Sequence, residues 1–192
     1  MLNIFSAFGL ASSAGLNAYI PLLLVALAAR FPLQDPFLQL SAPYDALGSW
    51  WAIGVIAVFL LIEMTVDKIP AVDTVNDGIQ TFIRPAAGAV LFAANANIVT
   101  EIHPALALTA GLLVAGGVHA AKGTARPVVT ATTAGTGNWF VSLVEDIAAF
   151  FVTIVSIFLP VLGMVLAVLV IIMFARWVRR RKKEPPIVYQ PR

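Results

Sequence analysis

Long stretches of this sequence contain no Asp, Glu, Lys or Arg, and this feature most limits what the chain can fold into. The uncharged runs cover residues 1–29, 46–62, 85–100, 102–121, 127–144 and 147–175. An apolar run of about 18 residues or more is typical of a helix that crosses a lipid bilayer. Only 11% of the chain is charged, against about 25% in an ordinary soluble domain. We therefore exclude a soluble globular protein and expect an all-α, polytopic membrane protein.

The basic residues indicate how about six spans are oriented. With both termini in the cytoplasm, only Arg30 lies outside, as the positive-inside rule favours. The basic residues that then lie inside are Lys68, Arg84, Lys122, Arg126 and those of the tail. From Arg176 onward the chain has seven basic residues and one acidic residue. This pattern predicts a membrane domain over residues 1–178 and a basic cytoplasmic tail over 179–192, held at an anionic leaflet rather than at a nucleic acid.

Some of the runs need a more careful interpretation. The run 1–29 lacks the positive start of a cleaved signal peptide, and we expect it to be a retained first span. The fifth span must either include the polar stretch 133–138 or carry Glu145 and Asp146 into the membrane. Five spans with a re-entrant segment within residues 127–153 therefore remain the alternative. Pro160 and Gly163 are expected to break the last run, which is too long for one straight span. Pro, Gly, Asp and Thr content predicts loops over 31–49, 67–79 and 122–138.

The two parts of the chain, about 1–101 and 102–178, resemble each other. FGLASSAGLNAY (8–19) matches AGLLVAGGVHAA (110–121), which pairs Asn17 with His119. LIE (61–63) matches LVE (143–145), which pairs Glu63 with Glu145, and Pro85 and Gly88 recur as Pro160 and Gly163. Three spans in each half would place the second copy upside down. The pattern thus predicts an inverted repeat with broken helices, a plan found in many transporters.

Several motifs carry a resemblance to a known family. The segments DKIPAVDTVNDGIQTFIRPAAG (67–88), HAAKGTAR (119–126) and GNWFVSLVEDIAAF (137–150), with SAGLNAYIPLL near the start, resemble the bacterial membrane family catalogued as domain of unknown function 4126. The resemblance covers nearly the whole chain and implies a location in the bacterial inner membrane. That family has no established activity, so the resemblance implies no mechanism. The chain departs from the family at Asn17, where a basic residue is expected more often.

Acidic residues inside or beside apolar runs are the sharpest functional signal. A carboxylate near the bilayer centre costs at least about 2.5 kcal/mol on insertion scales. Glu63 and Asp67 lie four residues apart, and Glu145 and Asp146 have apolar neighbours on both sides. One interpretation pairs these carboxylates with basic residues or solvates them at the interface. The other gives them a role in binding or moving a proton or a cation, with Glu145 as the strongest candidate.

Basic and polar residues form a second set. His119, Lys122 and Arg126 follow the i, i+3, i+7 spacing of one helix face, and Arg84 stands just before Pro85. Together with Asn17 they could bind an anionic substrate or a lipid headgroup, although such residues can also serve only to fix topology. His103 and His119 lie far apart in a chain without cysteine, so we predict no metal site and no cofactor.

Asp67, Lys68, Pro70 and Asp73 form the most distinctive local motif. Proline favours the first turn of a helix, and aspartate can cap free N–H groups. The motif predicts a structured connection between spans, and Pro85 and Gly88 belong to the same structural set. A discontinuous helix that exposes its backbone ends to a substrate is the functional alternative.

These observations lead to three hypotheses about function. Motifs of hydrolases, metalloproteases and phosphate-binding loops are missing, which disfavours an enzyme. The leading hypothesis is a small transporter-like membrane protein, expected to be a homodimer, that binds or moves an anionic small molecule or lipid headgroup with proton or cation coupling. The alternatives are a membrane scaffold or assembly factor, whose buried charges only join helices, and an enzyme that modifies lipid headgroups.

Overall fold

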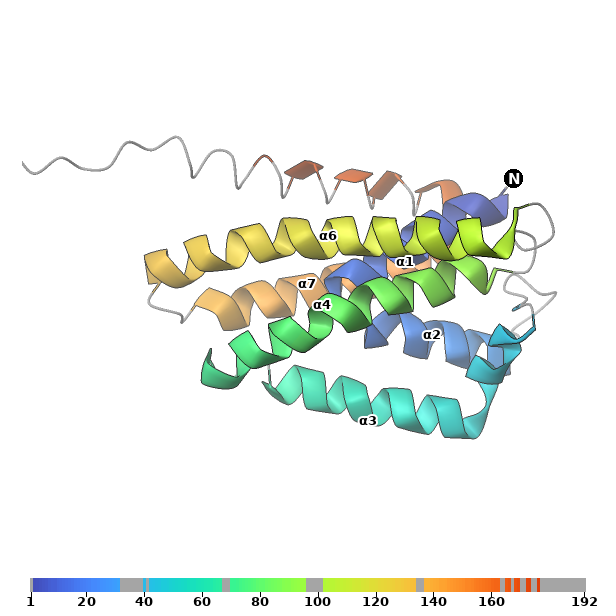
Figure 1. Ribbon diagram of the computed structural model, residues 1–192, viewed down its shortest axis with the longest axis horizontal. Helices are drawn as coiled ribbons and strands as arrows, with labels where there is room; N and C mark the ends of the chain where they lie inside the picture. Colours follow the sequence, from blue (N-terminus) through green and yellow to red (C-terminus); the bar gives the residue numbers. More distant parts are fainter. Residues whose placement is uncertain are drawn as a thin grey trace, which may run out of the picture.

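The computed structural model describes a bundle of helices (Figure 1). It describes residues 2–31, 40, 42–66, 70–95, 102–133 and 137–162, and also positions 165, 166, 168, 169, 172, 173 and 176. The side chains of residues 2, 3, 70–75, 77, 125, 126 and 128 lie outside this description. Within the described residues the only extended pairing is a single bridge between Leu40 and Asn95. The prediction of an all-α fold is confirmed.

The helices follow the apolar runs of the sequence. They are α1 (Leu2–Leu16), α2 (Tyr19–Arg30), the short 3-10 helix η1 (Tyr44–Gly48), α3 (Trp50–Val66), α4 (Pro70–Ala93), α6 (Pro104–Thr133) and α7 (Gly137–Phe158). Alanine and leucine, which favour helices most strongly, are frequent in these segments. Two prolines lie inside helices, Pro85 in α4 and Pro127 in α6. Each removes one backbone N–H from the helical hydrogen-bond pattern.

Helix α1 is the central element of the bundle. It packs against α4, α6 and α7, and α4 and α6 pack against each other along much of their length. Helix α3 lies at the edge, where it contacts mainly α2 and, to a smaller extent, η1 and α4. The core is built from small and aliphatic side chains of the central helices, among them Leu10, Ala14, Leu91 and Ala115.

Glycine allows the central helices to approach one another closely. A Cβ atom added at Gly88 of α4 would lie 2.3 Å from Cβ of Ala115 in α6. One added at Gly111 of α6 would lie 2.4 Å from the carbonyl oxygen of Gly88, and one at Gly15 of α1 would lie 2.5 Å from that of Ala115. Small residues at such crossings let backbones meet directly, as they do between helices in membranes.

Hydroxyl side chains join α1 to α7. Ser6 Oγ donates to the carbonyl oxygen of Ser156 at 2.6 Å, and Ser13 Oγ lies 2.7 Å from the carbonyl oxygen of Ala149 and from Thr153 Oγ1. Ser13, Thr153 and Ser156 are completely buried. The interface of these two helices is therefore held by hydrogen bonds as well as by apolar contact.

The expectation of one span over residues 1–29 is wrong. Helix α1 ends at Leu16 and α2 begins at Tyr19, and the chain reverses its direction between them (Figure 1). The cause is Asn17, whose Oδ1 accepts hydrogen bonds from the backbone N–H groups of Tyr19 at 3.0 Å and Ile20 at 3.1 Å. This side chain satisfies donors that a new helix leaves free, and so it stabilises a helix start inside an apolar run.

Two of the predicted loops are largely helical. The interval 67–79 is helical from Pro70, where α4 begins as the proline predicted, and 122–138 is helical up to Thr133 and again from Gly137. The lower helix propensity of their Gly and Thr residues, about 1 kcal/mol or less per residue, does not interrupt the helices here. The predicted fifth span over 127–144 is not one helix, because its first residues end α6 at Thr133 and α7 begins at Gly137 and contains Glu145 and Asp146.

The break in the last uncharged run lies where proline predicts it. Helix α7 ends at Phe158, two residues before Pro160. The inverted repeat of three helices in each half is not confirmed. The described part of the first half already contains α1, α2, α3 and α4, and α1 and α6 run in the same direction whereas α3 and α7 run in opposite directions (Figure 1).

The outer surface of the bundle is strongly apolar. Trp51 is 87% exposed and Phe82 is 79% exposed, and many Leu, Val and Ile side chains are exposed as well. Among the described helices, α6 and α7 are long and apolar enough to cross a membrane, as judged by length and composition alone. Such a surface is compatible with a location in a lipid bilayer.

Candidate functional site

A buried ion pair joins α3 to α4. Arg84 Nη2 lies 2.9 Å from Glu63 Oε1, and each side chain is only 1% exposed. The sequence predicted that Arg84 opens a span. It stands instead within α4, because this helix begins as early as Pro70. A guanidinium group keeps its charge under all ordinary conditions, so Glu63 is the carboxylate that compensates it inside the bundle.

His119 of α6 extends this pair. Arg84 Nη1 lies 3.3 Å from His119 Nδ1, and Thr81 Oγ1 lies 3.1 Å from His119 Nε2. A neutral histidine in this position would accept from Arg84 at Nδ1 and donate to Thr81 at Nε2. The group therefore connects α3, α4 and α6 through one continuous set of polar contacts.

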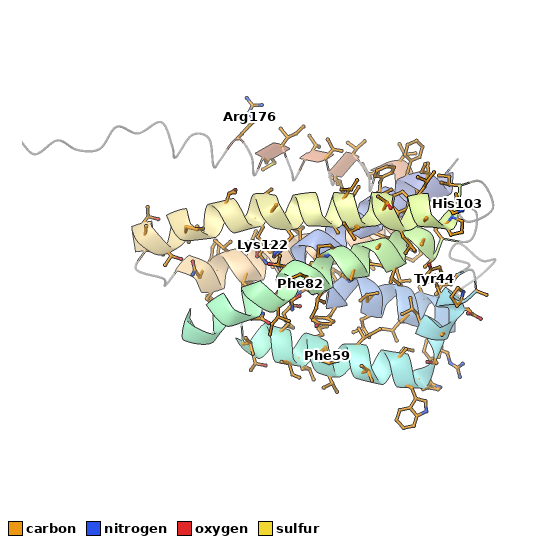
Figure 2. All side chains as sticks on the ribbon, in the orientation of Figure 1. Tyr44, Phe59, Phe82, His103, Lys122 and Arg176 are labelled. Carbon is orange, nitrogen blue, oxygen red and sulfur yellow. The ribbon has the colours of Figure 1, made fainter. Side chains whose placement is uncertain are left out.

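A second buried ion pair joins α6 to α7 and also reaches α1. Lys122 Nζ lies 2.7 Å from Glu145 Oε2 and 3.3 Å from the carbonyl oxygen of Leu16, the last residue of α1. Figure 2 shows the labelled Lys122 side chain leaving α6 toward the interior of the bundle. A cation at the carboxyl end of a helix also interacts favourably with the helix dipole. Lys122 thus both neutralises the carboxylate of Glu145 and stabilises the carboxyl end of α1.

Asn17 connects the helix break to the same group. While its Oδ1 caps α2, its Nδ2 donates to Asp146 Oδ1 at 2.9 Å. Asp146 follows Glu145 in α7, so the two carboxylates are neighbours. Glu145 is connected to the end of α1 by Lys122, and Asp146 is connected to the start of α2 by Asn17. Asn17 is buried, with 1% exposure, and its amide uses its donor and acceptor sides in different directions.

The two predicted sets of site residues are therefore interlocked. The basic residues proposed for an anion, Arg84 and Lys122, are ion-paired with Glu63 and Glu145, carboxylates proposed for a coupling ion. His119 and Lys122 stand three residues apart on α6 and link the two pairs. The pairing explains how charges can be buried here at all, since an unpaired buried charge is strongly unfavourable.

Other predicted residues lie elsewhere or outside the description. Asp67 and Lys68 fall between the described ranges, and the side chains of Pro70, Asp73 and Arg126 are not described. Pro85 lies within α4, and Gly88 lies at the closest contact between α4 and α6. His103 is exposed near the start of α6, where its Nδ1 accepts from the N–H of Ala105, and it lies well away from Lys122 (Figure 2).

The sequence interpretation missed two buried polar residues. Tyr19 and Gln80 are hydrogen-bonded to each other and lie beside Glu63 and Arg84, and Gln80 is 2% exposed. Gln80 precedes Arg84 by four residues, so both belong to one face of α4. That spacing was a signal in the sequence for a continuous polar face.

An open groove lies between α2, α3 and α7. Its volume is about 400 Å³, and its walls expose no polar atoms. Residues that line it include Leu24 of α2, Leu60 of α3, and Asp146 and Phe150 of α7. Among the described residues, no group of three His, Asp or Glu side chains is placed to hold a metal ion.

Comparison with known proteins places the chain in a family. The model of the family described as domain of unknown function 4126 matches residues 4–180. The chain belongs to this family. The result confirms the resemblance seen in the sequence motifs, and membership in the 4126 family brings no activity with it. No curated protein and no solved structure matches the chain.

Proposed function

We propose that this protein is an integral membrane protein. In the apolar 18-residue stretches of α6 and α7, only 22% and 39% of the residues are buried within the chain. A core helix of a soluble protein would bury most of such a stretch, whereas lipid accepts exposed apolar side chains without cost. The family resemblance favours the bacterial inner membrane. The distribution of basic residues favours a cytoplasmic tail, and the small size of the chain favours a homodimer.

The reversal at Asn17 supports a revised topology for this proposal. Helices of 15 and 12 residues span only about 23 and 18 Å, less than a hydrocarbon core of about 30 Å. Helices α1 and α2 would then form a re-entrant hairpin that starts and ends on one side. Helix α3, whose 17 residues just reach the shortest length of a span, would cross, and so would α4, α6, α7 and the segment after Phe158, which makes five crossings. This arrangement still leaves Arg30 outside and the tail inside, but it moves the N-terminus to the outer side.

Within this topology, the function supported best is that of a small transporter-like protein. The observation that carries it is the helix break at Asn17, which lies among buried ionised groups instead of at the surface of the bundle. Transporters commonly place discontinuous helices at the site for substrate and coupling ion, because the ends of half-helices bind charge. This chain contains both a discontinuous helix, broken at Asn17, and buried charged groups beside the break.

The ion pairs also indicate how coupling could work. An anionic small molecule or headgroup can reach Arg84 or Lys122 only if it replaces the carboxylate that already binds that cation. Protonation of Glu63 or Glu145 removes the competing negative charge. The cation then becomes available to the substrate, so that proton and anion are bound together. Glu145 is the more suitable group, since its partner Lys122 also contacts the carboxyl end of α1.

Reconstitution tests the proposal. Purified protein in proteoliposomes is expected to exchange small anions, and the rate should increase when the outside is acidified. Glu145→Gln should remove this flux while the protein stays folded. Val144→Ala, a change at the exposed neighbouring position, is the matched control. Flux that persists in Glu145→Gln would sink the assigned role of Glu145.

The absence of cysteine allows a second test of the same proposal. Single cysteines at positions 63, 145 and 146 are treated in sealed vesicles with an impermeant thiol reagent applied from either side. Labelling at 145 or 146 that changes with pH supports a polar pathway to the helix break. If neither position is labelled in folded protein, no pathway reaches the site.

A membrane scaffold is the second candidate, and one observation favours it. Charged side chains of the site join helices in pairs: α3 to α4 through Glu63 and Arg84, and α6 to α7 through Lys122 and Glu145. Charges used only in this way would hold the bundle together. This candidate predicts that Glu145→Gln lowers the melting temperature markedly and that the wild-type protein shows no flux.

A further inference from the structure

The ammonium group of Lys122 lies where a free cation would bind. Helix α1 ends at Leu16 and leaves its last carbonyl oxygens without partners inside the helix. The carboxyl end of a helix also carries partial negative charge. Lys122 Nζ meets this end at the carbonyl oxygen of Leu16, 3.3 Å away, and meets Glu145 Oε2 at 2.7 Å.

The surroundings of Lys122 have the chemistry of a monovalent-cation site. A backbone carbonyl at a broken helix together with a carboxylate is the set of ligands that transporters use for sodium ions or protons. The Lys122 side chain is 3% exposed, so water contributes little to its solvation. Asp146, held by Asn17 at the start of α2, adds negative charge nearby, whereas Arg84 is engaged by Glu63.

We propose that Lys122 is a tethered cation that occupies a monovalent-cation site formed by the Leu16 carbonyl and Glu145. The inference deepens the proposed function and rests on it, because it names the group that fills the coupling site. In this chain the positive charge comes from a lysine side chain, so a free sodium ion is not required. Removing the side chain should convert the site into one that binds sodium.

The expected conversion has a simple physical reason. Lys122→Ala leaves Glu145 without its cation and opens space the size of the lost side chain. A sodium ion supplies the missing charge and accepts oxygen ligands from Glu145 and Leu16. Lys122→Met removes the charge but keeps the space filled, so it offers no room for an ion.

The experiment measures melting temperature of the full chain in detergent while sodium chloride replaces choline chloride at constant total salt. For Lys122→Ala we expect a saturable rise of about 4 °C or more, as expected when a ligand binds only the folded state. The wild type and Lys122→Met should show no such rise. The double variant Lys122→Ala with Glu145→Gln should also show none, because it lacks the carboxylate.

A second variant covers the case in which Lys122→Ala is not recovered folded. Lys122→Ser leaves similar space and adds a hydroxyl oxygen as a ligand, so sodium should increase its folded yield and melting temperature. An equal response to sodium and choline, or no sodium response in Ala and Ser variants, would overturn the inference. So would failure to recover both variants in either salt.

The outcomes separate this inference from the proposed function. Flux through the wild-type protein without a sodium response in the variants refutes the tethered cation and leaves transport in place. A sodium response in Lys122→Ala without flux in the wild type establishes the cation site and refutes transport.

Discussion

The two buried ion pairs have the same chemistry but different surroundings. The pair of Arg84 and Glu63 lies between side chains of continuous helices, with His119 beside it. The pair of Lys122 and Glu145 adjoins a helix end, and Lys122 contacts backbone there. Arginine keeps its proton, whereas lysine can release one when it is buried. The comparison indicates that the first pair is structural and that the second is suited to change.

The largest effect is expected from breaking the first pair. Glu63→Leu leaves the guanidinium of Arg84 buried without its carboxylate, and we expect a loss of stability of about 3–5 kcal/mol. Glu145→Leu should lower the stability clearly less than Glu63→Leu does, because a buried lysine such as Lys122 can release its proton and lose its charge. Thermal and chemical unfolding in detergent micelles measures both changes.

A double variant provides the control for this prediction. Glu63→Leu combined with Arg84→Met replaces both charges by apolar side chains, which is often neutral for a buried pair. Its stability should return close to the wild-type value. If the two single losses are equal, or if the double variant stays as unstable as Glu63→Leu, the distinction between the pairs is wrong.

The crossing of α4 and α6 offers a way to disturb one pair more than the other. Gly88→Ala would place a methyl group 2.3 Å from Ala115 Cβ, and such overpacking costs about 1–3 kcal/mol. The resulting shift of α4 should affect the contact of Arg84 with His119 before it affects Lys122. Gly117→Ala, where no atom lies within 4 Å, should be close to neutral in the same unfolding assay.

The helix break can be tested at Asn17. Asn17→Ala removes the cap of α2 and the donor to Asp146, and loss of a cap costs about 0.5–2 kcal/mol. Asn17→Asp keeps the cap but places two carboxylates side by side. Its melting temperature should rise as pH is lowered, since protonation of one carboxyl removes the repulsion. A melting temperature independent of pH contradicts this contact.

The smallest effect on stability is expected at His119. His119→Gln keeps a side chain that can both donate and accept, and it should change stability by less than about 1 kcal/mol. If His119 connects the two pairs, the pH dependence of flux should shift in this variant. His103→Gln, at the exposed histidine, is the matched control and should leave the pH dependence unchanged.

Much of the architecture could be predicted from the sequence because apolar runs specify helices directly. The sequence also identified Glu63, Arg84, Lys122 and Glu145 as the unusual charged residues. It did not predict which carboxylate pairs with which cation, since that depends on the distance between helices. The inverted repeat is not confirmed, although Glu63 and Glu145, which it pairs in the sequence, are each buried in an ion pair with a cation.

The helix break was missed for a different reason. Hydropathy is continuous across residues 1–29, so it contains no sign of a reversal. Asparagine followed four residues later by Pro21 was the available signal, because a cap residue and a proline in the first turn both mark a helix start. The loop predictions over 67–79 and 122–138 failed because Gly, Thr and Asp lower helix propensity only weakly, and α4, α6 and α7 extend through most of these residues.

The hairpin of α1 and α2 has a consequence for how the chain is made. Asn17 and Leu16 find Asp146 and Lys122 at separations of 129 and 106 residues. Residues 16 and 17 are therefore synthesised more than 100 residues before either of these partners. If the chain is the membrane protein proposed above, its segment α1–α2 is a continuous hydrophobic stretch until α7 is synthesised, and the insertion machinery can hold it across the membrane. Its return to a hairpin becomes a late step of biogenesis, and a chain that stops before α7 should leave its amino-terminal segment in the wrong orientation.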